Sequence, residues 1–447
     1  MIDISRADFG KDFSWGVSTA AYQIEGAYQK NGKGLSIWDL FTQKKGKIVN
    51  NENANIACDF YHRYANDLAL MRSMHIPHYR FSLSWSRIFP SGTGPVNKAG
   101  VDFYNRVIDF CLELEITPWI TLYHWDLPYE LEKKGGWVNR EIINWFCEYV
   151  QFCIRHFGDR VKNWIVLNEP MAFTGAGYFL GVHAPGKKGL SNFLAAAHHA
   201  SLCQAEGGRL IRSESAGFKI GSSFSCSVVS PLSTTEQDIL AAQKIDALLN
   251  RVFIEPLLGL GYPSKTLKIL ERMELFVKNG DEQKQAFDMD FIGVQHYTRE
   301  VVMHSYLSPF LQAKIVKASE RLEATTLMNW EIYPQGMYHI LRQFWNYGNI
   351  RELIVTENGA AFPDQVENGS VNDLQRKEYL QRYLSYALKA KNEGINVNGY
   401  FVWSFTDNFE WAEGYRPRFG LVYVDFPTQK RIVKASGRWY SHFLHHA

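Results

Sequence analysis

Two glutamates stand directly after short apolar runs, in the strings Asn168-Glu169-Pro170 and Thr356-Glu357-Asn358-Gly359. The runs before them are Trp164-Ile165-Val166-Leu167 and Leu353-Ile354-Val355. An apolar run that stops at a carboxylate is typical of a buried strand that brings an acid to the mouth of a fold. One such Glu could be a salt-bridge partner. Two in matched settings indicate a carboxylate pair able to cleave a glycosidic bond.

The distance between the two carboxyl groups would decide the stereochemistry of that reaction. Retaining enzymes hold the pair about 5–5.5 Å apart, so that one carboxylate attacks the sugar directly. Inverting enzymes hold the pair roughly 6.5–9.5 Å apart, which leaves room for a water molecule. The residues alone leave both arrangements open.

Polar and aromatic residues also follow the ends of other apolar runs. They are Gln23, Glu25, Arg80, Trp85, His124, Trp125, Tyr297 and Trp403. This set contains no Ser/His/Asp elbow, no His-x-x-x-His and no carboxylate cluster with metal-ligand spacing. Hydrogen-bond donors, acceptors and aromatic faces suit a neutral ligand with many hydroxyl groups. We therefore expect neither a metal nor a cofactor.

Eight apolar runs must position these side chains. They span residues 13–18, 79–84, 118–124, 164–168, 219–224, 291–297, 352–357 and 400–404. Amphipathic stretches with helical spacing separate the runs, for example over 60–71, 101–112 and 379–388. Apolar strands that alternate with helices indicate a parallel sheet covered by helices.

Eight such repeats favour a closed (β/α)8 TIM barrel over an open doubly wound sheet, and no Gly-x-Gly-x-x-Gly follows an early strand. No linker interrupts the chain, so we expect a single α/β barrel catalytic domain over residues 1–447. The two glutamates would then follow the fourth and seventh strands and face each other across the mouth. The long connections 31–55 and 297–330 are candidate walls of a pocket.

Charge and composition exclude several classes of partner. The formal net charge is +2 and basic residues form only short pairs, so we expect no nucleic acid partner. No apolar stretch approaches the roughly 20 residues that span a bilayer, so we expect no membrane partner. Residues 1–5 lack the pattern of a secretory signal, and the six scattered Cys suit a core. We expect a cytoplasmic protein, and its oligomeric state stays open.

The chain strongly resembles glycoside hydrolase family 1, the retaining enzymes of β-glucosidase type, from about Phe9 to Tyr440. The matching segments run in order across the chain: 13–26 (FSWGVSTAAYQIEG), 80–82 (RFS), 123–128 (YHWDLP), 168–170 (NEP), 183–186 (HAPG), 356–359 (TENG) and 407–411 (DNFEW). Each segment alone is a modest signal, and together they are highly specific.

The resemblance implies a role for each site residue. Glu357 corresponds to the nucleophile and Glu169 to the general acid/base. Arg80 would keep the pKa of Glu357 low and Tyr297 would orient this carboxylate. Glu169 would need a less polar setting to stay protonated. The residues implied in sugar binding are Asn168 at the 2-hydroxyl, Gln23, His124, Glu410 and Trp411 at the other hydroxyls, Trp403 as a stacking floor and Trp330 at the leaving group.

The resemblance implies hydrolysis of terminal β-D-glucosyl residues from cellobiose, short β-glucosides or aryl β-glucosides, with cellulose degradation as the wider process. Rival interpretations are β-galactosidase or β-fucosidase specificity, or net transglycosylation. A carbohydrate-binding pseudoenzyme would have lost a Glu, and neither is lost. Glu413, Pro417 and Phe419 stand where relatives that cleave 6-phosphorylated sugars bind the phosphate, which disfavours such substrates.

One residue departs from the family pattern. The family usually carries Asn-Tyr-Tyr at the end of the sixth strand, whereas this chain has Gln295-His296-Tyr297. Gln295 is one methylene longer than Asn. We hypothesise that it alters leaving-group preference or tolerance to glucose.

Overall fold

The computed structural model describes residues 4–445. Residues 1–3, which belong to the segment from which the lack of a secretory signal was predicted, lie outside the described residues, as do residues 446–447.

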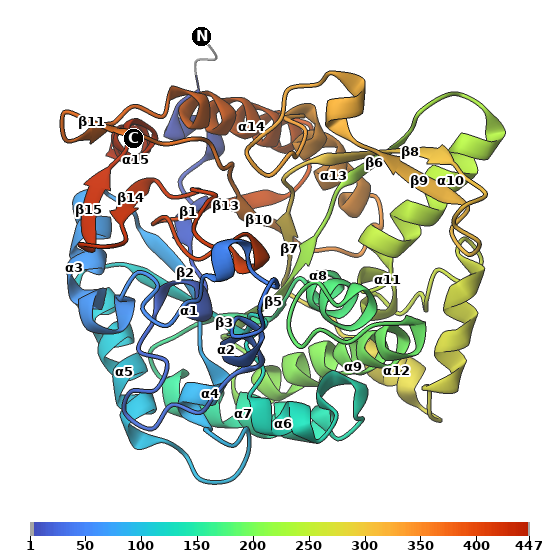
Figure 1. Cartoon of the computed structure of the whole chain (residues 1–447), viewed down its shortest axis with the longest axis horizontal. Coiled ribbons are helices and arrows are strands. Elements are labelled where there is room, and N and C mark those ends of the chain that lie inside the picture. The colour runs from blue at the N-terminus through green and yellow to red at the C-terminus, as the bar shows by residue number, and fades with distance from the viewer. Residues whose placement is uncertain (1–3, 446–447) are drawn as a thin grey trace.

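Eight parallel strands close into a barrel in the order β1-β13-β10-β7-β5-β4-β3-β2 (Figure 1). Their bounds are β1 Ser14–Ser18, β2 His78–Ser82, β3 Thr117–Tyr123, β4 Asn163–Asn168, β5 Lys219–Ser225, β7 Phe291–Gln295, β10 Leu353–Asn358 and β13 Val397–Trp403. The predicted (β/α)8 barrel is confirmed. The largest boundary difference is at β13, which begins before Tyr400, because Asn398 and Gly399 interrupt the apolar run without ending the strand.

Helices cover the outside of the barrel (Figure 1). The longer ones are α3 Phe60–Ser73, α5 Lys98–Glu113, α7 Ile142–Phe157, α9 Leu190–Glu214, α10 Glu236–Asp246, α13 Gln335–Trp345, α14 Leu374–Asn392 and α15 Ala435–His445. The shorter ones are α1 Ala21–Ile24, α2 Ile37–Phe41, α4 Trp85–Ile88, α6 Tyr129–Lys133, α8 Pro170–Thr174, α11 Ile254–Leu257 and α12 Asp281–Gln285. The three helical stretches predicted from spacing fall within α3, α5 and α14.

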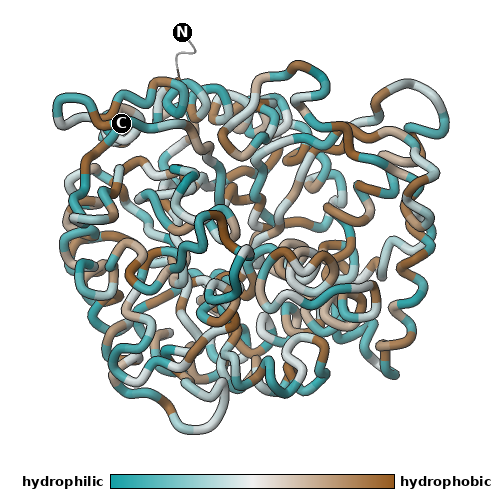
Figure 2. Tube along the Cα trace, viewed as in Figure 1, coloured by the Kyte–Doolittle hydropathy of each residue, from teal (hydrophilic) through white to brown (hydrophobic). Residues whose placement is uncertain are grey.

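Hydrophilic and hydrophobic residues alternate along the outer helices, as expected for helices with one face on the barrel (Figure 2). In α5, Tyr104, Ile108 and Cys111 are buried, whereas Leu112 is 41% exposed. Leu112 follows Cys111 directly and therefore points about 100° further round the helix. No helix within residues 4–445 combines the length and apolar composition needed to cross a membrane.

Large side chains fill the barrel interior on the side away from the catalytic carboxyl ends of the strands. Trp119, Ile165, Phe291, Ile354 and Phe401 come from five different strands and form a buried cluster. The Trp119 ring lies 5.5 Å from that of Phe291 and 5.1 Å from that of Phe401. Because this cluster closes the barrel interior, a ligand can enter only from the carboxyl ends of the strands.

Further strands form small sheets beside the barrel. β6 Val228–Pro231, β8 Arg299–His304 and β9 Ala313–Val316 form one sheet, which lies at the upper right of Figure 1 together with α10. β14 Val422–Asp425 pairs with β15 Lys430–Val433, and β11 Val366–Glu367 pairs with β12 Ser370–Val371.

Candidate active site

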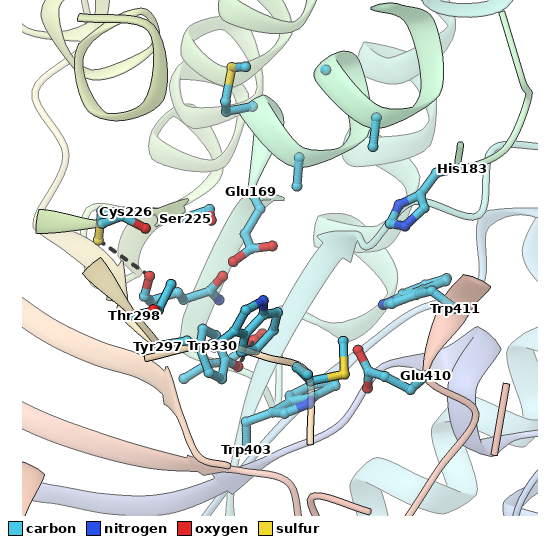
Figure 3. A pocket seen from close by; sticks show the side chains of 18 of the residues that line it. Glu169, His183, Ser225, Cys226, Tyr297, Thr298, Trp330, Trp403, Glu410 and Trp411 are labelled. Carbon is cyan, nitrogen blue, oxygen red and sulfur yellow. Dashed lines mark hydrogen bonds between the residues drawn. The ribbon is translucent and has the colours of Figure 1, made fainter. Parts of the chain in front are cut away.

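A pocket of about 460 Å³ opens at the carboxyl ends of the barrel strands. Predicted site residues that line it are Glu169, Glu357, His124, Tyr297, Trp330, Trp403, Glu410 and Trp411. In Figure 3, Glu169 enters from one side and Trp403 lies opposite, with Glu410 and Trp411 on one flank and Tyr297 and Trp330 on the other. The two predicted catalytic carboxylates therefore share one cavity.

Three predicted site residues lie behind the pocket wall. Gln23, Arg80 and Asn168 are fully buried and do not line the cavity. They reach the lining residues through hydrogen bonds and ion pairs, so in this structure their direct partners are protein groups.

Arg80 and Tyr297 hold the carboxylate of Glu357. Arg80 forms an ion pair with Glu357 Oε1, and the Tyr297 hydroxyl donates to Glu357 Oε2 at 2.8 Å. Both carboxylate oxygens are therefore fixed. This geometry leaves the carboxylate little freedom to rotate away from the cavity.

The amide of Asn168 is locked by three neighbours. Its Oδ1 accepts from Arg80 Nη2 at 2.5 Å and from Gln295 Nε2 at 2.8 Å. Its Nδ2 lies 3.0 Å from His124 Nε2. Burial and the charge of Arg80 lower the pKa of His124 well below its ordinary value, so the neutral ring can accept from Asn168. Gln295, the departure from the family pattern, thus belongs to the same network as Arg80.

The backbone turns sharply at Glu169. Its φ of 46° is in the left-handed region, which is uncommon for a residue with a side chain, and Pro170 follows as the first residue of α8. The Glu169 amide donates to the carbonyl of Ser223 on β5 at 2.8 Å. The strand therefore ends abruptly and directs Glu169 into the cavity. Backbone strain of this kind is often found at functional sites.

The two carboxyl groups have different electrostatic surroundings. Burial raises the pKa of Glu169 well above its ordinary value, and the negative charge of Glu357 raises it further. Burial also raises the pKa of Glu357, but Arg80 and hydrogen bonds from Tyr297 and Gln295 oppose that rise. Arg80 lowers the pKa of Glu357 as expected, but the expectation that this pKa is low overall is wrong, because desolvation is the larger effect. What remains is an asymmetry, with Glu169 the more readily protonated of the two.

Aromatic rings and a third carboxylate form the far end of the pocket. The His124 ring stacks with those of both Trp403 and Trp411, with ring centroids 5.9 Å apart in each pair. Gln23 Nε2 donates to the carbonyl of Phe409 at 2.9 Å and to Glu410 at 3.4 Å. Burial and the charge of Glu357 raise the pKa of Glu410 to about 8. Flat apolar faces beside a hydrogen-bonding carboxylate suit a sugar ring.

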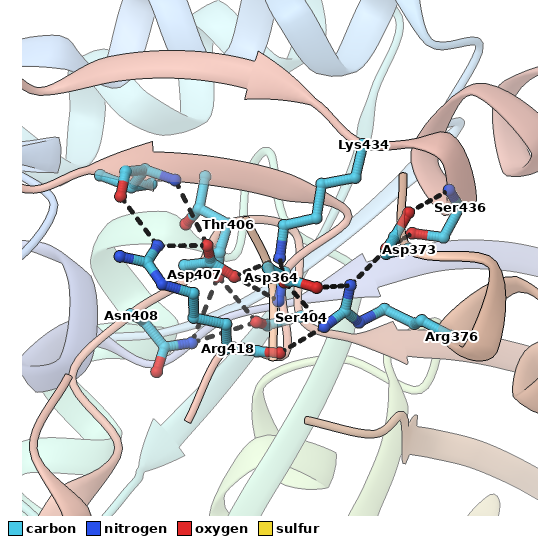
Figure 4. Close-up of polar contacts among 12 residues, drawn as sticks. Asp364, Asp373, Arg376, Ser404, Thr406, Asp407, Asn408, Arg418, Lys434 and Ser436 are labelled. Carbon is cyan, nitrogen blue, oxygen red and sulfur yellow. Dashed lines mark hydrogen bonds and ion pairs between the residues drawn. The ribbon is translucent and has the colours of Figure 1, made fainter. Parts of the chain in front are cut away.

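A buried ion network supports the loop that carries Glu410 and Trp411 (Figure 4). Asp407 accepts from Lys434 Nζ at 2.6 Å and from Arg418 at 2.7 Å. Lys434 also pairs with Asp364, which in turn pairs with Arg376 at 2.9 Å. The network therefore connects this loop, the residue that directly follows strand β15, and helix α14.

Several lining residues were not predicted from the sequence. They are Met171, Ala172, Gly175, Ala176, Leu180, His183, Ser225, Cys226, Ser227 and Leu249. The predicted wall 297–330 contributes, but no residue of 31–55 lines the pocket. Instead, Trp38 in that connection packs behind Trp411, with ring centroids 4.6 Å apart. The length of a connection therefore did not indicate whether it lines the pocket or packs behind the residues that do.

Metal-binding geometry is not found in the part of the chain that the structure describes, where no group of three or more His, Cys, Asp or Glu could hold an ion.

Trp330 lies 5.3 Å from the Tyr297 ring and 6.1 Å from that of Phe419, at the pocket edge. The cavity thus combines two carboxylates with unequal proton affinity, an aromatic end and a rim.

Comparisons with known proteins agree on one family. The model of glycosyl hydrolase family 1 matches residues 5–447. Beta-glucosidase A of Thermotoga maritima is 44% identical over 438 residues, which cover 98% of this chain and 97% of that protein. Beta-glucosidase A of Acetivibrio thermocellus is 41% identical and covers 99% of both chains. The solved structure of the Thermotoga maritima beta-glucosidase in complex with glucoimidazole superposes with a TM-score of 0.94, at 43% identity and 98% coverage of both chains.

Proposed function

The chain belongs to glycosyl hydrolase family 1, and we propose that it is a retaining β-glucosidase in which Glu357 is the nucleophile and Glu169 the general acid/base. The observation that carries these roles is the asymmetry between the two carboxyls. Glu357 has a buried cation and a tyrosine hydroxyl on its oxygens, whereas Glu169 faces the charge of Glu357.

The first step forms a covalent glucosyl-enzyme. The Glu357 carboxylate attacks the anomeric carbon as the bond from that carbon to the leaving oxygen breaks. Glu169 gives its proton to the leaving oxygen, so the departing group leaves as a neutral alcohol. The products of this step are the free alcohol and an ester between the sugar and Glu357.

The second step releases the sugar. Formation of the ester removes the charge of Glu357, so one of the causes that raise the pKa of Glu169 disappears. Glu169, now ionised, takes a proton from water as the water oxygen bonds to the anomeric carbon. The ester bond breaks and Glu357 becomes a carboxylate again. Two inversions give net retention.

The remaining lining residues suit the recognition of glucose. Trp403, Trp411 and His124 offer ring faces, and Glu410 offers a carboxylate to sugar hydroxyls. Behind the pocket wall, Arg80, Gln295 and His124 hold the amide of Asn168, for which the family resemblance implies a contact with the 2-hydroxyl. Trp330 at the rim is suited to the leaving group. A small-molecule β-glucoside or oligosaccharide is the proposed substrate.

A kinetic comparison tests these roles. Nitrophenyl β-glucoside should be hydrolysed by the wild type, and Glu357→Ala should lose activity by several orders of magnitude. Glu115→Ala is the matched control, since Glu115 is exposed and precedes β3 at the opposite end of the barrel. Full turnover by Glu357→Ala would refute the mechanism, and a preference for β-galactosides or β-fucosides in the same assay would refute the glucosidase assignment. The cytoplasmic location and a role in cellulose breakdown stay predictions.

A further inference from the structure

The pocket contains a carboxylate that the proposed mechanism does not use. Of the lining carboxylates, Glu357 pairs with Arg80, Glu410 accepts from Gln23, and Glu413 pairs with Arg416. Glu169 is the acid/base. Glu300 also lines the cavity, yet its side-chain carboxylate has no hydrogen-bond or ion-pair partner among residues 4–445.

Strand β8 directs Glu300 toward the pocket. Successive side chains of a strand point to opposite faces of the sheet. Arg299 therefore points to one face, where it pairs with Glu331 at 2.7 Å and stacks on Tyr333. Glu300 shares the other face with Val302, which packs with Leu249 and helix α10. Leu249 itself lines the pocket, so Glu300 lies where this packed face meets the cavity.

The arginine side chains near Glu300 form ion pairs with a different carboxylate. Arg299 and Arg321 both pair with Glu331. Arg321 lowers the pKa of Glu300 and Glu331 raises it, but burial dominates and brings this pKa to about 7. A half-buried carboxylate without donors is poorly solvated, and a ligand that supplies donors would relieve that cost.

Glu300 lies on the leaving-group side of the cavity. It comes after β7 has ended at Gln295, further along the chain than Tyr297 and Thr298. Ser227, Leu249 and Met328 line the cavity with it, whereas the residues suited to glucose are Trp403, Glu410 and Trp411. In Figure 3 Tyr297, Thr298 and Trp330 lie on the flank opposite Glu410 and Trp411.

We infer that Glu300 recognises the leaving group by accepting hydrogen bonds from hydroxyls of a second sugar unit. This inference rests on the proposed function and adds a specificity-determining residue to it. A carboxylate can accept from two adjacent hydroxyls at once, and a sugar offers such pairs. A nitrophenyl group has no hydroxyl to donate. Glu300 therefore favours glycosyl leaving groups over aryl ones.

The test compares Glu300→Gln and Glu300→Ala on cellobiose, cellotriose and nitrophenyl β-glucoside. Loss of hydrogen bonds to a charged acceptor should lower kcat/KM of Glu300→Ala on both oligosaccharides about tenfold or more. Glu300→Gln keeps one acceptor oxygen and should lose less. The same parameter for nitrophenyl β-glucoside should stay within about twofold of the wild type, because the glucose-binding residues are untouched.

The matched control is Glu323→Gln, since Glu323 is an exposed carboxylate near Arg299 and Arg321 that does not line the pocket. It should leave all three substrates unchanged. Equal losses on aryl and glycosyl substrates, or no loss on either, would overturn the inference while leaving the glucosidase function intact. An aminoalkyl β-glucoside is assayed as a fourth substrate, and a loss confined to it would overturn the inference in favour of a cationic leaving group. A wild type inactive on every glucoside would instead refute the proposed function.

Discussion

Arg80 and Glu357 form an ion pair in which the guanidinium is fully buried and the carboxylate side chain is 5% exposed. Arg80 also donates to Asn168 at 2.5 Å, so one cation connects the proposed nucleophile to the amide beside the proposed acid/base. Within residues 4–445, no cation forms an ion pair with Glu169. The unequal surroundings of the two carboxyls follow from this relationship and lead to predictions for pH dependence, specificity and stability.

The pH profile of kcat/KM should be bell-shaped. Activity requires Glu357 ionised and Glu169 protonated, so the rate rises as Glu357 loses its proton and falls as Glu169 loses its own. Because burial and the charge of Glu357 raise the pKa of Glu169 well above its ordinary value, the falling limb should lie far above the range of a free carboxyl. These apparent values belong to the coupled pair.

Glu169→Gln should show no falling limb; this variant is assayed on dinitrophenyl β-glucoside, whose leaving group needs no proton, so that its activity can be measured. A falling limb that persists at the same pH in Glu169→Gln would assign that titration to another group, and Glu410 would be the first candidate because its pKa is raised to about 8.

Tyr297→Phe should move the rising limb to higher pH. The Tyr297 hydroxyl donates to Glu357 at 2.8 Å and lowers the pKa of that carboxyl. Without this donor the pKa of Glu357 rises further, by up to about one unit, so Glu357 ionises at a higher pH. The measurement is kcat/KM for nitrophenyl β-glucoside across pH. A rising limb at the wild-type position, or one moved to lower pH, contradicts the role given to Tyr297.

Gln295→Asn should affect substrates that carry a 2-hydroxyl. The shorter side chain would lose the 2.8 Å hydrogen bond to Asn168, leaving Arg80 and His124 to orient that amide. We expect kcat/KM to fall by about three- to tenfold on nitrophenyl β-glucoside and to stay nearly constant on its 2-deoxy analogue. Glucose inhibition should be measured in parallel. Unchanged kinetics and inhibition across several leaving groups would remove a functional role for Gln295.

Lys434→Met should destabilise the protein and weaken sugar binding. Lys434 pairs with Asp364 and Asp407 and is itself fully buried, so its removal leaves two buried carboxylates short of a cation. The expected loss is about 3 kcal/mol, visible as a lower Tm, together with a higher KM because Asp407 supports the loop of Glu410. Lys430→Met, an exposed change at the start of β15, the strand that Lys434 directly follows, is the control. Equal Tm values for the two variants would contradict this role.

The barrel could be predicted from the sequence because its eight strands are short apolar runs, each of which ends at polar or aromatic residues. The carboxylates Glu169 and Glu357 could be found for the same reason. The full burial of Arg80, Gln23 and Asn168 could not be predicted. The local sequence pattern does not indicate whether a side chain at the end of a strand faces the cavity or a neighbouring strand.

Glu300 lies in the connection 297–330, which was predicted as a pocket wall, but its role was not predicted. The direction of its side chain depends on strand β8, which pairs with β6 from a distant part of the sequence. The pKa of Glu357 was predicted to be low, whereas it is raised. The sequence motifs indicate the contact with Arg80, but they do not indicate how deeply the carboxyl of Glu357 is buried.

The central claim is that Glu357 forms a covalent bond to the sugar. It is tested most directly by incubating the protein with 2-deoxy-2-fluoro-β-glucosyl fluoride, whose good leaving group permits the first step while the fluorine slows both steps. Mass spectrometry of the digested protein should find one fluoroglucosyl group, attached to the peptide that contains Glu357. Attachment to Glu169, or an unlabelled protein that releases α-glucose first from a β-glucoside, would contradict the account.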